Sequence, residues 1–88
     1  MDNEKFINLC KKLVREYATN HLDKSREIPS FNVFAAWSCK VLQNNKAILS
    51  TTLPDNMYYE LTYNGDKKEL YFDAYEKFED RKIKVEEN

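Results

Sequence analysis

The chain has 88 residues, of which 42% are hydrophobic and 14% aromatic, and its net charge at pH 7 is −1. This length predicts one domain, residues 1–88, and the apolar share is too high for a disordered chain. The balanced charge disfavours a general coat for DNA or RNA, because such proteins carry an excess of lysine and arginine on one face. Two cysteines, no leader segment and no apolar run near the roughly 20 residues of a membrane span predict a reduced protein of the cytoplasm that does not enter membranes.

An amphipathic helix is predicted for about residues 3–22. Apolar residues recur there mostly at steps of three and four, which places them on one stripe of a helix. The stripe consists of Phe6, Ile7, Leu9, Cys10, Leu13, Val14, Tyr17, Ala18 and Leu22. Asp2 or Asn3 can cap the first turn, and Cys10 lies inside the stripe, so we expect a buried thiol there.

Four runs with strand character follow the helix. They span about residues 32–43, 46–53, 57–63 and 68–77. The turn signals between them are Asn44-Asn45, Pro54-Asp55-Asn56 and Asn64-Gly65-Asp66. Asparagine and glycine tolerate the positive φ of tight hairpin turns, so consecutive antiparallel hairpins are expected. The sequence therefore predicts an α+β fold in which the N-terminal amphipathic helix packs on a four-stranded antiparallel meander sheet.

The C-terminal tail, from Asp73 to Asn88, fits two interpretations. Tyr71, Tyr75 and Phe78 have helical spacing, whereas the alternation of the same segment fits a longer last strand. We favour a strand that ends near Lys77 and resumes at about residues 83–85, followed by frayed final residues.

The segment VFAAWSCKVL, residues 33–42, contains the only tryptophan and one of the two cysteines. Strand alternation places on one side the row Val33, Ala35, Trp37, Cys39 and Val41. With a turn at Asn44-Asn45, the next strand would place Ile48 opposite Val41, Ser50 opposite Cys39 and Thr52 opposite Trp37. We interpret the row as the inner side of the sheet. Cys39 is then a structural thiol rather than a nucleophile, since no cation or base shares its side.

Enzyme chemistry finds little support in these residues. One histidine and two distant cysteines are poor material for a metal site, and a single glycine, Gly65, cannot build a glycine-rich phosphate loop. Glu60 and Asp73 could act as an acid–base pair or hold Mg²⁺, but strand patterning favours the solvated side of an alternation. We expect no catalytic, cofactor-binding or metal site and no enzyme activity.

The side of the last hairpin that faces away from the core carries the candidate binding residues. Alternation brings together Tyr58, Glu60, Tyr71, Asp73 and Tyr75. Tyrosine is enriched at protein interfaces, so these residues form a hypothetical docking patch for a basic surface, including the DNA-binding surface of another protein. The competing interpretation is that strand propensity alone places tyrosine here. A partner protein, a second copy of the chain or the C-terminal tail could each cover such a patch.

Three stretches of the sequence are distinctive. They are FINLCKKLVREYA (6–18), the WSCK, LQN, KA and LSTTL segments between residues 37 and 53, and YYELTYNGDKKELY (58–71). In these stretches, which cover nearly the whole chain, the protein resembles an uncharacterised family of small proteins encoded by phages and prophages of low-GC Gram-positive bacteria. The resemblance implies an early or accessory phage product in the cytoplasm of a bacterial host. It implies no activity and no site residues.

Two function classes remain open. In the first, a phage accessory protein binds a protein partner in the host and modulates it, for example as an inhibitor of a host or phage nucleic-acid enzyme. The alternative is a nucleic-acid-binding module of a phage replication region, in which tyrosine stacking is combined with Lys40, Lys46, Lys67 and Lys68. Capture of one stoichiometric host protein would indicate the first class. Binding to single strands that weakens steeply with salt would indicate the second.

Overall fold

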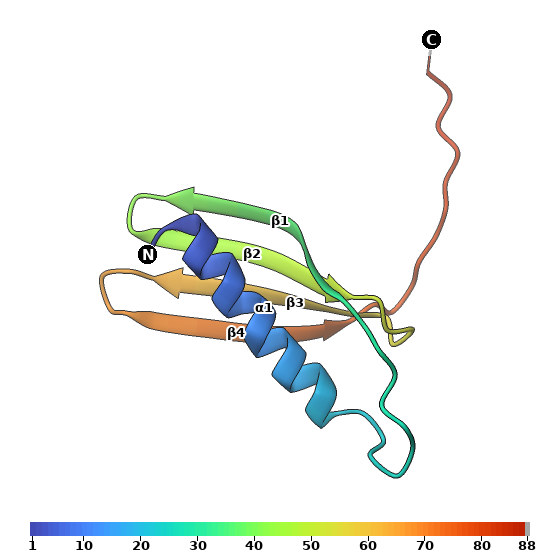
Figure 1. The fold of residues 1–88 in the computed structure, drawn as a ribbon. Helices are drawn as coiled ribbons and strands as arrows, with labels where there is room; N and C mark the ends of the chain where they lie inside the picture. Colours follow the sequence, from blue (N-terminus) through green and yellow to red (C-terminus); the bar gives the residue numbers. More distant parts are fainter. Residues whose placement is uncertain (88) are drawn as a thin grey trace.

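The computed structural model describes residues 1–87, so Asn88, the last residue of the predicted domain, lies outside the described residues. The elements are α1 (Asn3–Asn20), β1 (Val33–Val41), β2 (Asn44–Thr51), β3 (Met57–Asn64) and β4 (Glu69–Glu76). The strands form one antiparallel sheet in the order β1-β2-β3-β4, and α1 crosses one of its faces (Figure 1). The predicted α+β fold, one helix on a four-stranded antiparallel meander, is confirmed.

Helix α1 is capped by a side chain at its first turn and by a backbone N–H at its last turn. The Asp2 carboxylate accepts a hydrogen bond from the Lys5 backbone N–H at 2.9 Å, and Glu4 places negative charge in the first turn. The helix ends at Asn20, two residues before the predicted end. His21 is the C-cap, and its backbone N–H bonds to carbonyls of the last turn.

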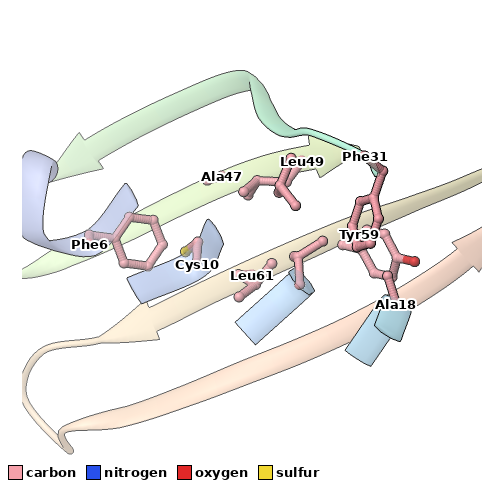
Figure 2. Packing of buried hydrophobic residues seen from close by; sticks show 10 residues of the cluster. Phe6, Cys10, Ala18, Phe31, Ala47, Leu49, Tyr59 and Leu61 are labelled. Atoms are coloured by element: carbon pink, nitrogen blue, oxygen red, sulfur yellow. The ribbon is translucent and has the colours of Figure 1, made fainter. Parts of the chain in front are cut away.

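The core lies between α1 and the sheet (Figure 2). From the helix it takes four side chains at steps of four: Phe6, Cys10, Val14 and Ala18. From the strands it takes alternate residues, as one side of a pleated sheet must. The buried hydrophobic residues of the strands and of the segment before β1 are Phe31, Val33, Ala47, Leu49, Tyr59 and Leu61. The predicted buried thiol at Cys10 is therefore confirmed.

The placement of Trp37, Cys39 and Val41 on the inner side is wrong. A β-bulge separates Ala35, which lies opposite Leu49, from Trp37, which lies opposite Ile48. Residues directly opposite each other share a face, so the strand changes sides at the bulge. Val33 stays buried under α1, whereas Trp37 is 50% exposed and Val41 is 61% exposed on the other side. Because α1 covers the side of Ala47 and Leu49, Ile48 and its opposite neighbours face away from the core.

The first hairpin also turns two residues earlier than predicted. Leu42 and Gln43 form the turn, with Leu42 at a positive φ of 56°, and both asparagines that were expected to turn belong to β2. In the last hairpin the positive φ, 54°, falls on Lys68 rather than on Gly65. Gly65 is needed for a different reason. A Cβ there would lie 2.1 Å from the Gln43 carbonyl oxygen, so glycine lets the two turns pack together.

The C-terminal tail forms neither of the predicted elements beyond β4. The last strand ends at Glu76, one residue before the predicted end, and residues 77–87 contain no helix or strand. The expected return to a strand at residues 83–85 is therefore wrong. Figure 1 shows the tail running away from the sheet, and the side chains of Phe78, Ile83 and Val85 are exposed. In this structure the tail does not cover the sheet.

Candidate functional site

The sheet face opposite α1 is covered by no other described element (Figure 1). We call it the outer face. Its members follow from the cross-strand pairs that lie opposite one another on the side away from the helix. They are Phe34, Trp37, Cys39 and Val41 from β1, Asn44, Lys46, Ile48 and Ser50 from β2, Tyr58, Glu60, Thr62 and Asn64 from β3, and Glu69, Tyr71, Asp73 and Tyr75 from β4. Exposed aromatic and aliphatic side chains that gather on one face often mark an interaction surface.

The structure brings all five predicted patch residues together on the β3–β4 half of this face. Tyr58 lies opposite Tyr75, and Glu60 lies opposite Asp73. The rings of Tyr58 and Tyr75 are stacked, with centroids 5.0 Å apart and an interplanar angle of 16°. Tyr71 is 51% exposed and Tyr75 41%, so both rings keep surface for contact. Regular pairing of β3 with β4 explains why strand alternation found this group.

Charge on the β3–β4 half is mainly negative. The Lys46 ammonium forms an ion pair with Glu60, Nζ to Oε1 at 2.9 Å, and this carboxylate raises the pKa of Lys46. Among residues 1–87, no cation forms an ion pair with Asp73, whose charge raises the pKa of the Tyr75 phenol. The Tyr71 hydroxyl donates a hydrogen bond to Glu69 Oε2 at 2.8 Å, and this bond raises the pKa of the Tyr71 phenol. One lysine thus stands among three carboxylates.

Apart from Asn44, Lys46 and Ser50, the β1–β2 half of the outer face is apolar, and the sequence interpretation missed it. Phe34 is 45% exposed and Trp37 50% exposed, next to Val41 and the half-buried Ile48. Two open hollows lie on this half. One, of about 260 Å³, is lined by residues that include Trp37, and the other, of about 380 Å³, by residues that include Phe34 and Ile48. Contact with a partner would remove the apolar surface of this row from water, which favours binding.

The four lysines of the nucleic-acid alternative do not share one strand surface. Lys46 is on the outer face, where Glu60 holds it. Lys40 lies opposite Asn45, on the side of the sheet that α1 covers. Lys67 and Lys68 belong to the turn between β3 and β4. A continuous cationic track for a phosphate backbone would need several of these charges in a row.

Catalytic and metal-binding groups are sparse in residues 1–87. This part of the chain has no cluster of three or more His, Cys, Asp or Glu side chains that could hold a metal ion. Glu60 and Asp73 are cross-strand neighbours, but Glu60 is bound to Lys46. Cys39 is half-buried on the outer face. The absence of enzyme activity stays a prediction. Among the described residues, no helix has the length and apolar character to cross a membrane.

Comparison with known proteins gives one match. The model of a protein family described as "Family of unknown function (DUF6275)" matches residues 7–85. No curated protein matches the chain, and no solved structure matches it. The matched span includes α1 from its second turn, all four strands and most of the tail.

Proposed function

The chain belongs to the family of unknown function DUF6275, and from its own surface we propose that it is a small accessory protein that binds another protein through the outer face. The observation that carries this proposal is the uncovered sheet face itself. One of its halves is apolar, around Trp37 and Phe34, and the other presents tyrosines among carboxylates. Aromatic side chains with polar tips give large contact area at low entropic cost, which makes them frequent interface anchors.

The size of the outer face suits a small specific interface. Eight residues along a strand cover about 27 Å and four strands about 19 Å, a flat area of roughly 500 Å², which upright side chains increase further. Specific interfaces bury about 800 Å² on each partner, so a partner would use nearly all of this face. The apolar β1–β2 half would supply the desolvated centre, and the acidic β3–β4 half would orient a basic surface.

A basic protein surface fits the charges better than a nucleic acid does. Glu60, Asp73 and Glu69 lie on the face, and they would repel a phosphate backbone while attracting lysine and arginine side chains. The DNA-binding surface of a host or phage nucleic-acid enzyme is one such partner, and binding there would block its substrate. The nucleic-acid-binding module of a replication region remains the second candidate, supported by the exposed tyrosine rings.

The biological setting belongs to the same proposal. The resemblance of the chain to proteins encoded by phages and prophages of low-GC Gram-positive bacteria supports action in the cytoplasm of a bacterial host. A partner protein there would be host-encoded or phage-encoded. Self-association is the competing explanation, since the exposed apolar sheet face of one molecule can also pack against that of a second copy of the chain.

Affinity capture with matched variants tests this proposal. The immobilised protein is exposed to lysate of a Gram-positive host, and each captured protein is then compared between the parent chain and two variants. Replacement of Trp37 and Tyr71 by alanine should weaken capture at least about 30-fold, because interface aromatics often contribute 2 kcal/mol or more. The melting temperature should change little, because both rings are about half exposed.

The control is Phe78→Ala, which removes a fully exposed aromatic ring from the tail. It should leave capture unchanged. If the outer-face double variant captures the same protein as tightly as the parent, or if the tail variant loses it equally, the outer face is not the partner surface. Size-exclusion and light-scattering measurements on the purified chain separate self-association from partner binding. Salt-sensitive binding of single-stranded oligonucleotides, lost in the double variant, would favour the second candidate.

A further inference from the structure

A second candidate site lies on the helix side of the sheet, away from the outer face. It is a hollow of about 260 Å³ where the end of α1 meets the start of β3 and the end of β4. The residues that matter for its chemistry are Tyr17, His21, Asp55, Met57, Tyr59 and Glu76. Met57 lies opposite Glu76 in the sheet, so both side chains belong to the side that α1 covers. The hollow is independent of the surface assigned to the proposed function.

The hydroxyl of Tyr59 opens into this hollow without a partner. The residue is 1% exposed, and its ring packs against Tyr17 and Phe72 with centroids 5.6 Å and 5.8 Å apart. Figure 2 shows the oxygen pointing away from the packed cluster, on the side of Ala18. Among residues 1–87, no group forms a hydrogen bond with this oxygen. The oxygen is not one of the buried polar atoms that lack a partner, so it reaches the hollow and is open to water or a ligand.

Negative charge lines the hollow that this hydroxyl enters. Two carboxylates, Asp55 and Glu76, line the hollow, and its lining contains no lysine or arginine. Burial, together with the charge of Asp55, raises the pKa of the Tyr59 phenol, which indicates that the carboxylate acts on the hydroxyl. The negative end of the α1 dipole also points here, and the last turn of the helix holds no basic residue.

The remaining walls are apolar or aromatic. Met57 contributes a thioether chain from the sheet. The Tyr17 ring stacks on the His21 ring with centroids 4.1 Å apart, and His21 Nδ1 lies 2.8 Å from the Tyr17 carbonyl oxygen, where it donates a hydrogen bond. These contacts fix both rings in place. The hollow therefore combines a preformed apolar wall with two carboxylates and one hydroxyl oxygen that no protein group among residues 1–87 bonds, the usual composition of a small-ligand pocket.

We propose that this hollow binds one organic cation, an alkylammonium or alkylguanidinium group. The alkyl chain packs against Tyr17 and Met57, and the cationic head lies between Asp55 and Glu76. A nitrogen of that head donates a hydrogen bond to the Tyr59 hydroxyl oxygen. An inorganic cation would leave the apolar wall unused, and a neutral alkyl group would leave both carboxylates without a cationic partner. A free amine and the side chain of a lysine or arginine present the same chemistry.

The test is an NMR titration of the isotope-labelled protein with n-butylammonium chloride, with n-pentanol as the neutral ligand of similar shape. We expect saturable amide shifts at Tyr17, Met57 and Glu76 with the cation and no saturation with the alcohol. The variant Asp55→Asn/Glu76→Gln should bind at least about tenfold more weakly, because each lost charge removes a charged hydrogen bond. Asn at position 55 keeps an oxygen to accept the Met57 backbone N–H, which Asp55 Oδ1 binds at 3.1 Å.

Two further variants make the result specific. Tyr59→Phe removes only the unpartnered oxygen and should weaken binding roughly threefold to tenfold without lowering the melting temperature. Asp66→Asn/Glu86→Gln removes the same net charge from the β3–β4 turn and the tail, and should leave binding unchanged. Melting curves of all variants confirm that each one is folded.

The proposal is overturned if n-butylammonium gives no saturable shift in the parent chain, or if the turn-and-tail control loses binding as much as the pocket variant. Blocked amino acids separate the two sources of the cation. Tighter binding of Nα-acetyl-lysine amide or Nα-acetyl-arginine amide than of n-butylammonium identifies a protein side chain as the occupant. Tighter binding of n-butylammonium identifies a free amine. A failed titration would leave the outer-face proposal untouched, because the two sites share no residue.

Discussion

The two faces of one sheet differ in almost every physical respect. On the covered face, Leu49, Tyr59 and Leu61 are almost completely buried under α1. On the outer face of the same sheet, Trp37 of β1 and Tyr71 of β4 keep about half of their surface. The packed core therefore lies on one face only, and the aromatic side chains of the other face stay exposed. Substitutions on the covered face should therefore change stability, and substitutions on the outer face should change binding.

The largest expected difference comes from replacing one large aromatic on each face. Phe6→Ala should lower the free energy of unfolding by about 3–5 kcal/mol, because it opens a cavity in the core. Trp37→Ala should lower it by less than about 1 kcal/mol, because the ring is half exposed and no element packs over it. Urea unfolding of both variants measures the two values. Equal losses would mean that the outer face is part of a packed interior.

Asn45 provides a smaller contrast inside the covered face. Its side chain is 1% exposed, and within residues 1–87 neither Nδ2 nor Oδ1 has a hydrogen-bond partner. Such a group costs its desolvation energy, so Asn45→Leu should raise the free energy of unfolding by about 1–2 kcal/mol. The outer-face neighbour Asn44→Leu is the control and should not stabilise the chain, since the Asn44 Oδ1 accepts a bond from Gly65 N–H at 3.2 Å. A destabilised Asn45→Leu would indicate a buried polar partner for this amide.

The two thiols extend the comparison to alkaline pH. Burial raises the pKa of Cys10 to about 12, whereas an unfolded cysteine ionises near 8.5. Between these values the unfolded chain binds fewer protons than the folded one, so the free energy of unfolding falls as pH rises. Near pH 10 this contribution should amount to about 1–2 kcal/mol. It should vanish in Cys10→Ala and persist in Cys39→Ala, as urea titrations at pH 7.5 and pH 10 would show. The same alkaline loss in Cys10→Ala and the parent would contradict a buried Cys10.

Regular alternation made half of the outer face predictable from sequence. β3 and β4 pair without irregularity, so the alternation of Tyr58 and Glu60 with core residues gave the right side for the whole predicted patch. The helix was predictable for a similar reason, because its stripe repeats every three to four residues and Asp2 caps it. In both cases the hydrophobic periodicity of the segment agrees with the face that it packs against the core.

The β1–β2 half of the outer face was not predictable from sequence, because a β-bulge in β1 decides which residues face outward. Residues 33–37 are all apolar, so an inserted residue at Ala36 leaves no trace in the alternation, yet it moves Trp37 to the opposite face. The turn at Leu42 is a similar case, because a leucine at positive φ gives no local signal while two asparagines follow. The hollow around Tyr59 joins residues from α1, a loop and two strands, which only tertiary packing brings together.

Alkylation of Cys39 in the free and bound protein tests the central claim most directly. This thiol is the only one on the outer face, and Cys10 is an internal control because it is fully buried. In the free native protein Cys39 should react while Cys10 reacts only after unfolding. Saturation with the purified partner from the capture experiment should protect Cys39 at least about tenfold, since contact excludes the reagent from the interface. Full reactivity of Cys39 in the saturated complex would contradict binding through the outer face.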